Sequence, residues 1–314
     1  MKTTEMNIES TPHVATAGYA DRPVTKTPNW HGLVTLDILF NNLSTGLFLV
    51  AAIGELAAPA TFRALGGVAY PIALLFLIAD LVCLALDLGD PFRFHHMLRM
   101  WKPSSPMSLG TWCLTTYALP LTVLAMMSLL PGGAGLEWLR RIILVVGMVP
   151  AFGAAVYKGI LFSTTAQPGW SSARWLGGYL SSSALLLGAA ELLLLAIVLG
   201  QPRAAAVLRV ALMLLLGLNL AVLGLLLADL RGSLSRAHDT RAVALIGAVV
   251  VLAGLLVPLG LLALGAPVPM ATAVLLILMG AVGIRSEIVR LPHLLEAAGR
   301  SGQRALGRAA AEAR

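Results

Sequence analysis

The sequence predicts an all-α integral membrane protein with eight transmembrane helices. Eight stretches between about residue 33 and residue 290 are apolar and long enough to cross a bilayer, which takes about 20 residues in a helix. Hydrophobic residues make up 58% of the chain and charged residues only 12%, about half the charged share that is usual in a soluble domain. The apolar runs are continuous rather than alternating, which favours helices over a β-barrel.

The expected helices are joined by short connections, so little chain is left for a water-soluble domain. A polar N-terminal tail (1–32) precedes an eight-helix membrane domain (33–295), and a polar C-terminal tail (296–314) follows it. A faint repeat relates the first four spans to the last four and favours two four-helix bundles, at about 33–163 and 174–290. The expected spans are 33–57, 67–88, 106–131, 138–163, 174–199, 205–229, 241–265 and 268–290.

Lys and Arg are distributed unevenly between the two sides of these spans. Sixteen belong to the side that holds both termini and the 2–3, 4–5 and 6–7 connections, and five to the other side. Because cytoplasmic loops are enriched in Lys and Arg, we expect both termini in the cytoplasm. The net charge of +7 then reflects topology, and no nucleic-acid partner is expected. All six tryptophans lie near span ends, as in an interfacial belt.

The sequence contains no recognisable set of metal ligands. All six histidines fall in tails, connections or span ends, whereas a membrane haem of the b type takes its axial histidines from within helices. Cys83 and Cys113 stand alone in two spans, without the CxxC pairs of an iron–sulfur site. We therefore expect no haem, no iron–sulfur cluster and no metal site in this chain.

Several acidic residues fall within or near the ends of the expected spans, namely Asp37, Asp80, Asp87 and Glu191. Ionisable groups are costly inside a bilayer and are functional candidates for that reason. A carboxylate near the headgroups can exchange protons with a redox ligand. The same groups also serve as helix caps or ion-pair partners, and Lys158 in the fourth span needs such a partner.

Three segments carry more polar and small residues than a membrane helix needs. They read DLGDPFRF then KPSSPMSLGTW (87–112), YKGILFSTTAQPGW (157–170) and LFNNLSTGLFLVAA (39–52). The first is similar to D-L-G-x-P-x-R-F and N-P-x-S-P-M-S-x-G-x-W of the NrfD/PsrC family, the membrane subunits of polysulfide-reductase-like complexes. The second resembles the family's Tyr-x-Gly and A-x-P-x-W, and the third its small-residue first helix.

Three positions depart from the family's pattern. Asn41 and Asn42 replace a small or apolar pair, and Asp90 stands where a basic residue is common.

The resemblance implies a function. Such a chain is the membrane anchor subunit of a multisubunit respiratory oxidoreductase and binds a quinone or quinol, either menaquinone or ubiquinone. It exchanges electrons between the quinone pool and an iron–sulfur (ferredoxin-like) partner subunit. A catalytic subunit, for which molybdopterin is the expected cofactor, completes the complex. The resemblance also implies a multi-pass protein of the bacterial inner (cytoplasmic) membrane.

We expect the quinone site among the first four spans, near the 2–3 connection. The residues expected to take part in the reaction are Asp37, Asp87 and Tyr157, and the tyrosine hydroxyl would bind a quinone carbonyl. The residues expected to contact the cofactor are Asn41, Asn42, Arg93, His95, His96 and Tyr157. A packing role for the tyrosine and interhelical hydrogen bonds for the asparagines remain alternatives.

The 2–3 connection is also the expected docking surface of the iron–sulfur partner. It has the highest density of polar residues of any connection, with Arg93, His95, His96, Arg99 and Lys102. The charge bias places this connection in the cytoplasm, whereas the resemblance places the partner outside in many relatives. We follow the charge bias, because it belongs to this chain.

The alternative function, from another class, is that of a secondary transporter or ion-translocating membrane protein. Helices broken near the middle of the bilayer would indicate transport, but Gly and Pro lie mostly at span ends here. A purely structural anchor would leave the membrane carboxylates unexplained.

Overall fold

The computed structural model describes residues 32–88, 90–129, 136–238 and 252–312. All regular structure in these ranges is helical, which confirms the expected all-α class. Seven of the described helices are long and apolar enough to cross a membrane, so the chain is a multi-pass membrane protein. The expected span 241–265 lies partly outside the described residues, and the count of eight stays a prediction.

The membrane helices follow one another with short connections. They are α1 (Gly32–Ala57), α2 (Pro59–Leu86), α3 (Pro106–Leu129), α4 (Glu137–Ser163), α5 (Leu176–Val198), α6 (Pro202–Ala237) and α9 (Pro267–Glu312). The described part of the expected seventh span is a π-helical turn, η5 (Leu252–Leu256), followed by α8 (Val257–Leu264). The two longest described connections contain short 3₁₀ helices, η2 (Pro91–Arg99) and η4 (Trp170–Ser172).

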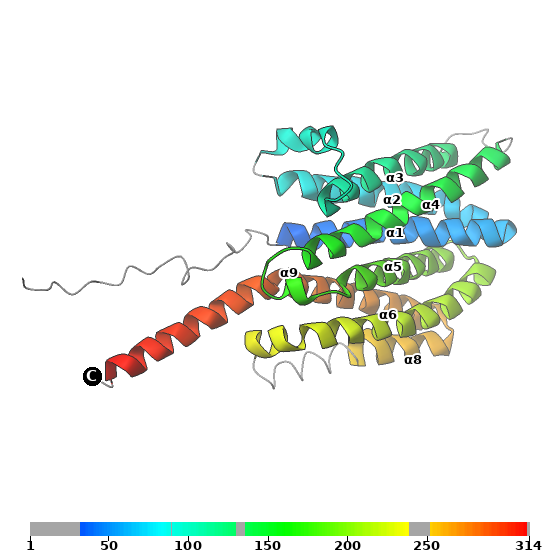
Figure 1. Cartoon of the computed structure of the whole chain (residues 1–314). Helices are drawn as coiled ribbons and strands as arrows, with labels where there is room; N and C mark the ends of the chain where they lie inside the picture. Colours follow the sequence, from blue (N-terminus) through cyan, green and yellow to red (C-terminus); the bar gives the residue numbers. More distant parts are fainter. Residues whose placement is uncertain (1–31, 89, 130–135, 239–251, 313–314) are drawn as a thin grey trace, which may run out of the picture.

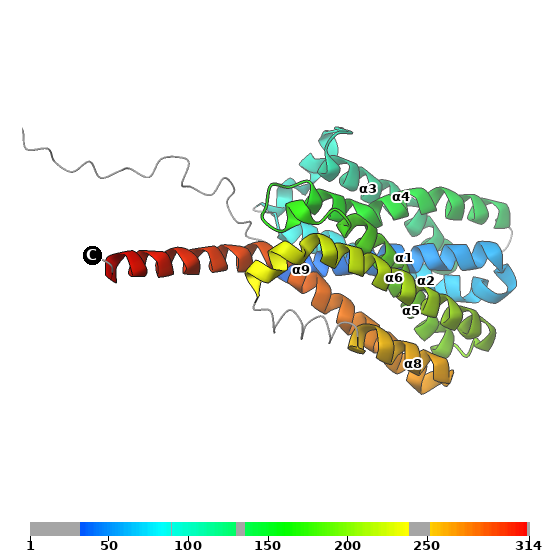
Figure 2. The same cartoon turned by 60° about the horizontal axis from the view of Figure 1, so that its bottom comes forward.

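Three helices extend well beyond the expected bounds, among them α6, which runs from Pro202 to Ala237 instead of 205–229. Helix α2 begins at Pro59 rather than near residue 67. The N–H groups of a helix's first turn have no acceptor within the helix, so proline, which lacks an N–H, is well suited to that position. Helix α9 does not end near residue 290 but continues to Glu312. Most of the expected polar C-terminal tail is therefore helix, and its end projects from the other helices (Figures 1 and 2).

The connections alternate between two ends of the molecule (Figure 1). The start of α1, η2, η4 and the C-terminal end of α9 lie at one end, which we call the η2 face. The α1–α2, α5–α6 and α8–α9 connections lie at the other end, the opposite face, together with the end of α3 and the start of α4. This is the grouping of connections on which the charge count rests.

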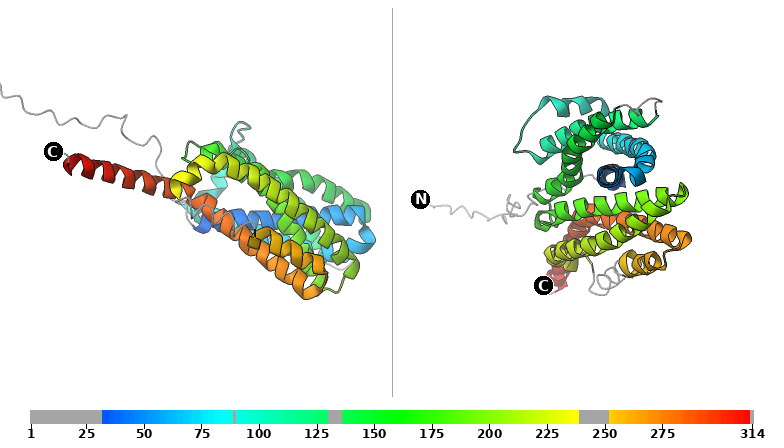
Figure 3. Two further views of the ribbon diagram at one scale, coloured as in Figure 1. Left: turned by 90° about the horizontal axis from the view of Figure 1, so that it is seen from below. Right: turned by 90° about the vertical axis from the view of Figure 1, so that its right-hand side faces the viewer.

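Helices α1 and α5 form the centre of the molecule (Figure 3). In their most apolar windows 78% and 61% of residues are buried, against 28–33% in the other spanning helices. The two helices touch at Gly46 and Gly188, where a Cβ atom on either residue would overlap the other helix. Small residues let membrane helices approach closely, so these glycines bring the two halves of the chain together.

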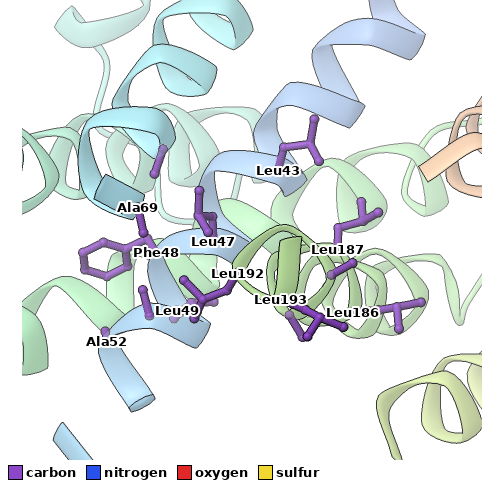
Figure 4. Packing of buried hydrophobic residues seen from close by; sticks show 14 of the residues in the cluster. Leu43, Leu47, Phe48, Leu49, Ala52, Ala69, Leu186, Leu187, Leu192 and Leu193 are labelled. Carbon is purple, nitrogen blue, oxygen red and sulfur yellow. The ribbon is translucent and has the colours of Figure 1, made fainter. Parts of the chain in front are cut away.

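The centre is packed with leucine and phenylalanine, including Leu47 and Phe48 of α1 and Leu187 and Leu193 of α5 (Figure 4). The outer helices instead expose large apolar side chains, such as Val149, which is 78% exposed. A water-soluble protein rarely exposes so much apolar surface. The outward-facing surface therefore fits contact with lipid tails.

Candidate functional site

A buried ion cluster joins α1, α2 and α4 close to the η2 face. The Lys158 ammonium lies 2.8 Å from Asp37 Oδ2 and 2.6 Å from Asp80 Oδ1. It also donates to the backbone carbonyl of Asp37 at 3.0 Å. All three side chains are buried. The three hydrogen-bond donors of a lysine match these three acceptors, so two carboxylates share one cation.

Asn41 extends this cluster by one helical turn along α1. Its Nδ2 atom donates to Asp80 Oδ2 at 3.2 Å. The opposite orientation of the amide would place Oδ1 against the carboxylate, where two acceptors would face each other, so the hydrogen bond fixes the orientation. With the amide fixed in this way, Asn41 Oδ1 is buried and has no hydrogen-bond partner in the described part of the chain. Asp37 Oδ1 is in the same situation. Two buried acceptors therefore remain unpaired on one face of α1, since residues four apart share a face.

Asn42 connects the cluster to the second half of the chain. Its Oδ1 atom accepts a hydrogen bond of 2.6 Å from Arg285 of α9, and its Nδ2 atom donates to the Ala155 carbonyl at 3.4 Å. Arg285 is completely buried and also donates to Ser183 of α5 at 3.1 Å. None of the ion pairs among the described residues pairs Arg285 with a carboxylate.

Within this group of four side chains, the charges of Lys158, the two carboxylates and Arg285 balance. The excess negative charge beside Lys158 comes from the second of the two carboxylates, and Arg285 supplies a matching positive charge. An uncompensated ion inside a bilayer costs at least about 2.5 kcal/mol. The adjacent residues Asn41 and Asn42 contact the carboxylate side and the arginine side respectively. This arrangement can hold a proton or a polar ligand without a large net charge.

Tyr157 lies beside this cluster and packs against α3. Its ring centroid is 5.6 Å from the Lys158 ammonium, and the side chain is buried. A Cβ atom at Gly110 would overlap the Tyr157 ring. Gly110 and Tyr157 come from the two polar segments of the sequence, so the glycine of one makes room for the tyrosine of the other.

The remaining expected site residues lie on the exposed 2–3 connection. Arg93 is 74% exposed and pairs with Asp90 at 3.0 Å. The His95 and His96 rings lie 4.2 Å apart, tilted by 38°, and the two side chains hydrogen-bond to Phe92 and Arg99 of η2. These polar contacts stay within η2 and its cap.

Asp87 caps the C-terminal end of α2 and is half-buried. The structure thus gathers Asp37, Asn41, Asn42 and Tyr157 between helices, and it places Arg93, His95 and His96 on the η2 face without contact to that group.

Residues at the start of α3 hydrogen-bond to the α2–α3 connection. Ser108 donates to the Met100 carbonyl at 2.9 Å and accepts the Lys102 N–H at 3.0 Å. The Trp112 indole N–H reaches the same carbonyl at 3.4 Å. The serine and tryptophan of this segment therefore hold the connection in place.

The end of the second polar segment has a structural role. Trp170 is fully buried and donates its indole N–H to the Ile288 carbonyl at 2.7 Å. That carbonyl has no helical donor, because the residue four positions on is Pro292. The assignment of this tryptophan to an interfacial belt is therefore wrong, since it packs on Phe162 inside the protein.

A second buried ion pair lies toward the opposite face. Glu55 accepts from Arg140 at 2.5 and 3.0 Å and from the Tyr70 hydroxyl at 2.9 Å. Arg63 lies 3.8 Å from Glu55 and also pairs with Glu137. Both carboxylate oxygens of Glu55 are thus satisfied, and this cluster reads as a structural contact between α1, α2 and α4.

The second ion pair was not predicted from the sequence, Lys158 and Arg285 were given no site role, and Asp80 was named only as one of several candidate carboxylates. A charged residue within an apolar span is costly, and this feature of the sequence could have identified these residues. The sequence could not show their partners, because Arg285 and Asn42 are 243 residues apart.

Comparison with known proteins gives one family. A family model described as polysulfide reductase, of the NrfD type, matches residues 18–293. The matched range includes both polar segments, the Lys158 cluster and Arg285. A comparison with curated proteins finds no match.

Proposed function

The chain belongs to the NrfD-type polysulfide reductase family, and from that premise we propose that it is the quinone-reactive membrane subunit of an oxidoreductase complex. The family consists of membrane subunits of redox complexes, which implies partner subunits. We assign the quinone site to the surroundings of Tyr157 and the Lys158 cluster. The quinone, menaquinone or ubiquinone, supplies the two-electron chemistry when it is bound.

The unpaired acceptors Asp37 Oδ1 and Asn41 Oδ1 carry this proposal. Buried polar atoms almost always have a hydrogen-bond partner, and an unsatisfied one costs about 1–3 kcal/mol. Because both atoms accept hydrogen bonds, they complement a ligand with hydroxyl donors, as a quinol has. The residues present therefore fit a quinol-binding site.

The chain's own groups divide the work of such a site. Asp37 has one oxygen held by Lys158 and one unpaired, so it can take a proton at Oδ1 while its other oxygen stays bound. Asn41 Oδ1 orients a donor. Tyr157 supplies a hydroxyl for the second ligand oxygen. Arg285 holds Asn42 and offsets the carboxylate charge.

The partner is proposed to dock on the η2 face. Helix η2 and the following residues expose apolar side chains outside the membrane helices, with Phe92 87% and Met100 66% exposed. They lie among the basic residues Arg93 and Arg99. Aromatic, Met and Arg side chains are enriched in protein interfaces. An iron–sulfur (ferredoxin-like) subunit here would bring its cluster near Tyr157, and a molybdopterin subunit would complete the complex.

The proposal also includes the orientation of the chain in the membrane and the absence of further cofactors. The charge bias favours a cytoplasmic η2 face and cytoplasmic termini, and the family favours the inner membrane of a bacterium. We expect no haem, metal or iron–sulfur cluster in this chain itself.

The transporter alternative has less support. It predicts helices broken near the middle of the bilayer. Pro71, Pro120 and Pro150 lie inside α2, α3 and α4, yet each of these is one continuous helix. The π-helical turn η5 is the irregular element of the described spans, and it lies outside the polar cluster.

The proposal is tested by Tyr157→Phe in the assembled complex. Loss of one hydrogen bond to the ligand lowers quinone turnover by about tenfold, with assembly unchanged. Tyr70→Phe is the matched control, because Tyr70 is also buried and hydrogen-bonded but belongs to the Glu55 cluster toward the opposite face. Wild-type turnover in Tyr157→Phe would refute the assignment of this tyrosine.

A further inference from the structure

A cavity at the opposite face contains a further polar group without a hydrogen-bond partner in the described part of the chain. The cavity has a volume of about 400 Å³ and opens between the α5–α6 and α8–α9 connections. Its walls are mostly alanine, isoleucine, proline and methionine side chains, and its polar side chains are Gln201 and Arg209. The quinone site proposed above lies near the η2 face, so the two places are separate.

Arg209 of α6 is the unusual feature of this cavity. Its Nε atom is buried and has no hydrogen-bond partner among the described residues. No ion pair of the described chain includes Arg209 either. Arginine stays protonated in proteins, and because the Arg209 side chain is only partly exposed, its charge is incompletely hydrated and gains from a partner. The cavity therefore presents a positive charge that lacks a counter-ion.

The Arg209 guanidinium lies against the α8–α9 turn. Gly265 ends α8 with a left-handed backbone, at a φ of 69°. A Cβ atom at Gly265 would also overlap the Arg209 guanidinium. The left-handed backbone is what requires glycine here, and the Arg209 guanidinium lies against this turn at the cavity wall.

We propose that this cavity binds an anionic phospholipid through its phosphate. The cavity lies where α5 ends at Val198, α6 begins at Pro202 and α9 begins at Pro267, and span ends lie at the depth of the headgroups. Arginine binds phosphate oxygens with two parallel hydrogen bonds. The apolar walls suit acyl chains, which a free phosphate lacks. No acidic side chain lines the cavity to receive a choline group.

The test compares lipid retention by the purified full-length chain. Native mass spectrometry after delipidation in detergent counts bound phosphatidylglycerol and phosphatidylcholine. We expect the wild type to retain phosphatidylglycerol, and Arg209→Gln to retain about tenfold less, as for one lost charge-assisted contact. The control is Arg203→Gln, an exposed arginine of the same helix that does not line the cavity. It should match the wild type.

Three results would overturn the proposal. These are equal retention of phosphatidylglycerol by Arg209→Gln, equal retention of phosphatidylcholine by the wild type, or thermal stabilisation of the wild type by inorganic phosphate as large as that by phosphatidylglycerol. The last would indicate a free-anion site. If Arg209→Gln does not fold, Arg209→Lys keeps the charge without the two-pronged geometry and should retain less phosphatidylglycerol than the wild type.

Discussion

Lys158 is the residue on which the buried cluster depends. It holds two carboxylates from two other helices, at 2.8 and 2.6 Å. The sequence places Lys158 inside a span and predicts that it needs a partner. It does not reveal that Asp80 and Asp37 both serve as partners, because the three residues come together only when α1, α2 and α4 pack.

Replacing Lys158 with methionine leaves two adjacent buried carboxylates without a cation. We expect the protein to lose about 3–5 kcal/mol of stability, as when one partner of a buried ion pair is removed. Thermal unfolding in detergent measures the loss. Lys102→Met, at an exposed position, should change it little, and adding Asp80→Asn to Lys158→Met should recover part of it. A Lys158→Met protein as stable as the wild type would show that the cluster does not stabilise the fold.

The elements were predicted unevenly, and the reason is physical. Long apolar runs predict that a helix exists, so seven of the spans reappear as helices, four of them close to their expected ranges. Helix ends depend on neighbours that the pattern does not show. Helix α9 continues through Pro292 because Trp170, from another element, satisfies the carbonyl that the proline leaves unpaired.

That contact between η4 and α9 makes a prediction about Trp170. Trp170→Phe keeps the ring but removes the donor to the Ile288 carbonyl. Stability should fall by about 1–3 kcal/mol, the cost of a buried unsatisfied acceptor. In a double-mutant cycle with Pro292→Ala, which restores a helical N–H at this position, the loss should shrink. Additive losses in thermal unfolding would mean that the two residues do not share this carbonyl.

The site was predicted in part for the same reason. Asp37, Asn41, Asn42 and Tyr157 were expected to be neighbours, and they lie together between the helices. His95 and His96 were expected beside them, but they lie on exposed η2. Residue type and closeness in sequence could not distinguish residues buried between the helices from residues on the exposed 2–3 connection.

The molecule as a whole has one end suited to a protein partner. The η2 face combines basic side chains with exposed aromatic and methionine side chains. Charge reversal in Arg93→Glu should weaken capture of the iron–sulfur subunit while the chain still inserts, because the substitution changes only an exposed side chain. Arg141→Glu, exposed at the opposite face, is the control. Co-purification measures binding, and full capture by Arg93→Glu would argue against docking at η2.

The central claim is that a quinone binds beside the Lys158 cluster, and photolabelling tests it most directly. The assembled complex in nanodiscs would be irradiated with an azido-quinone, and the labelled peptides identified by mass spectrometry. The account predicts label on α1 and α4 peptides around Asn41 and Tyr157, which excess unlabelled quinol removes and Tyr157→Phe weakens. Label confined to α5, α6 or α9, or label that quinol does not displace, would contradict it.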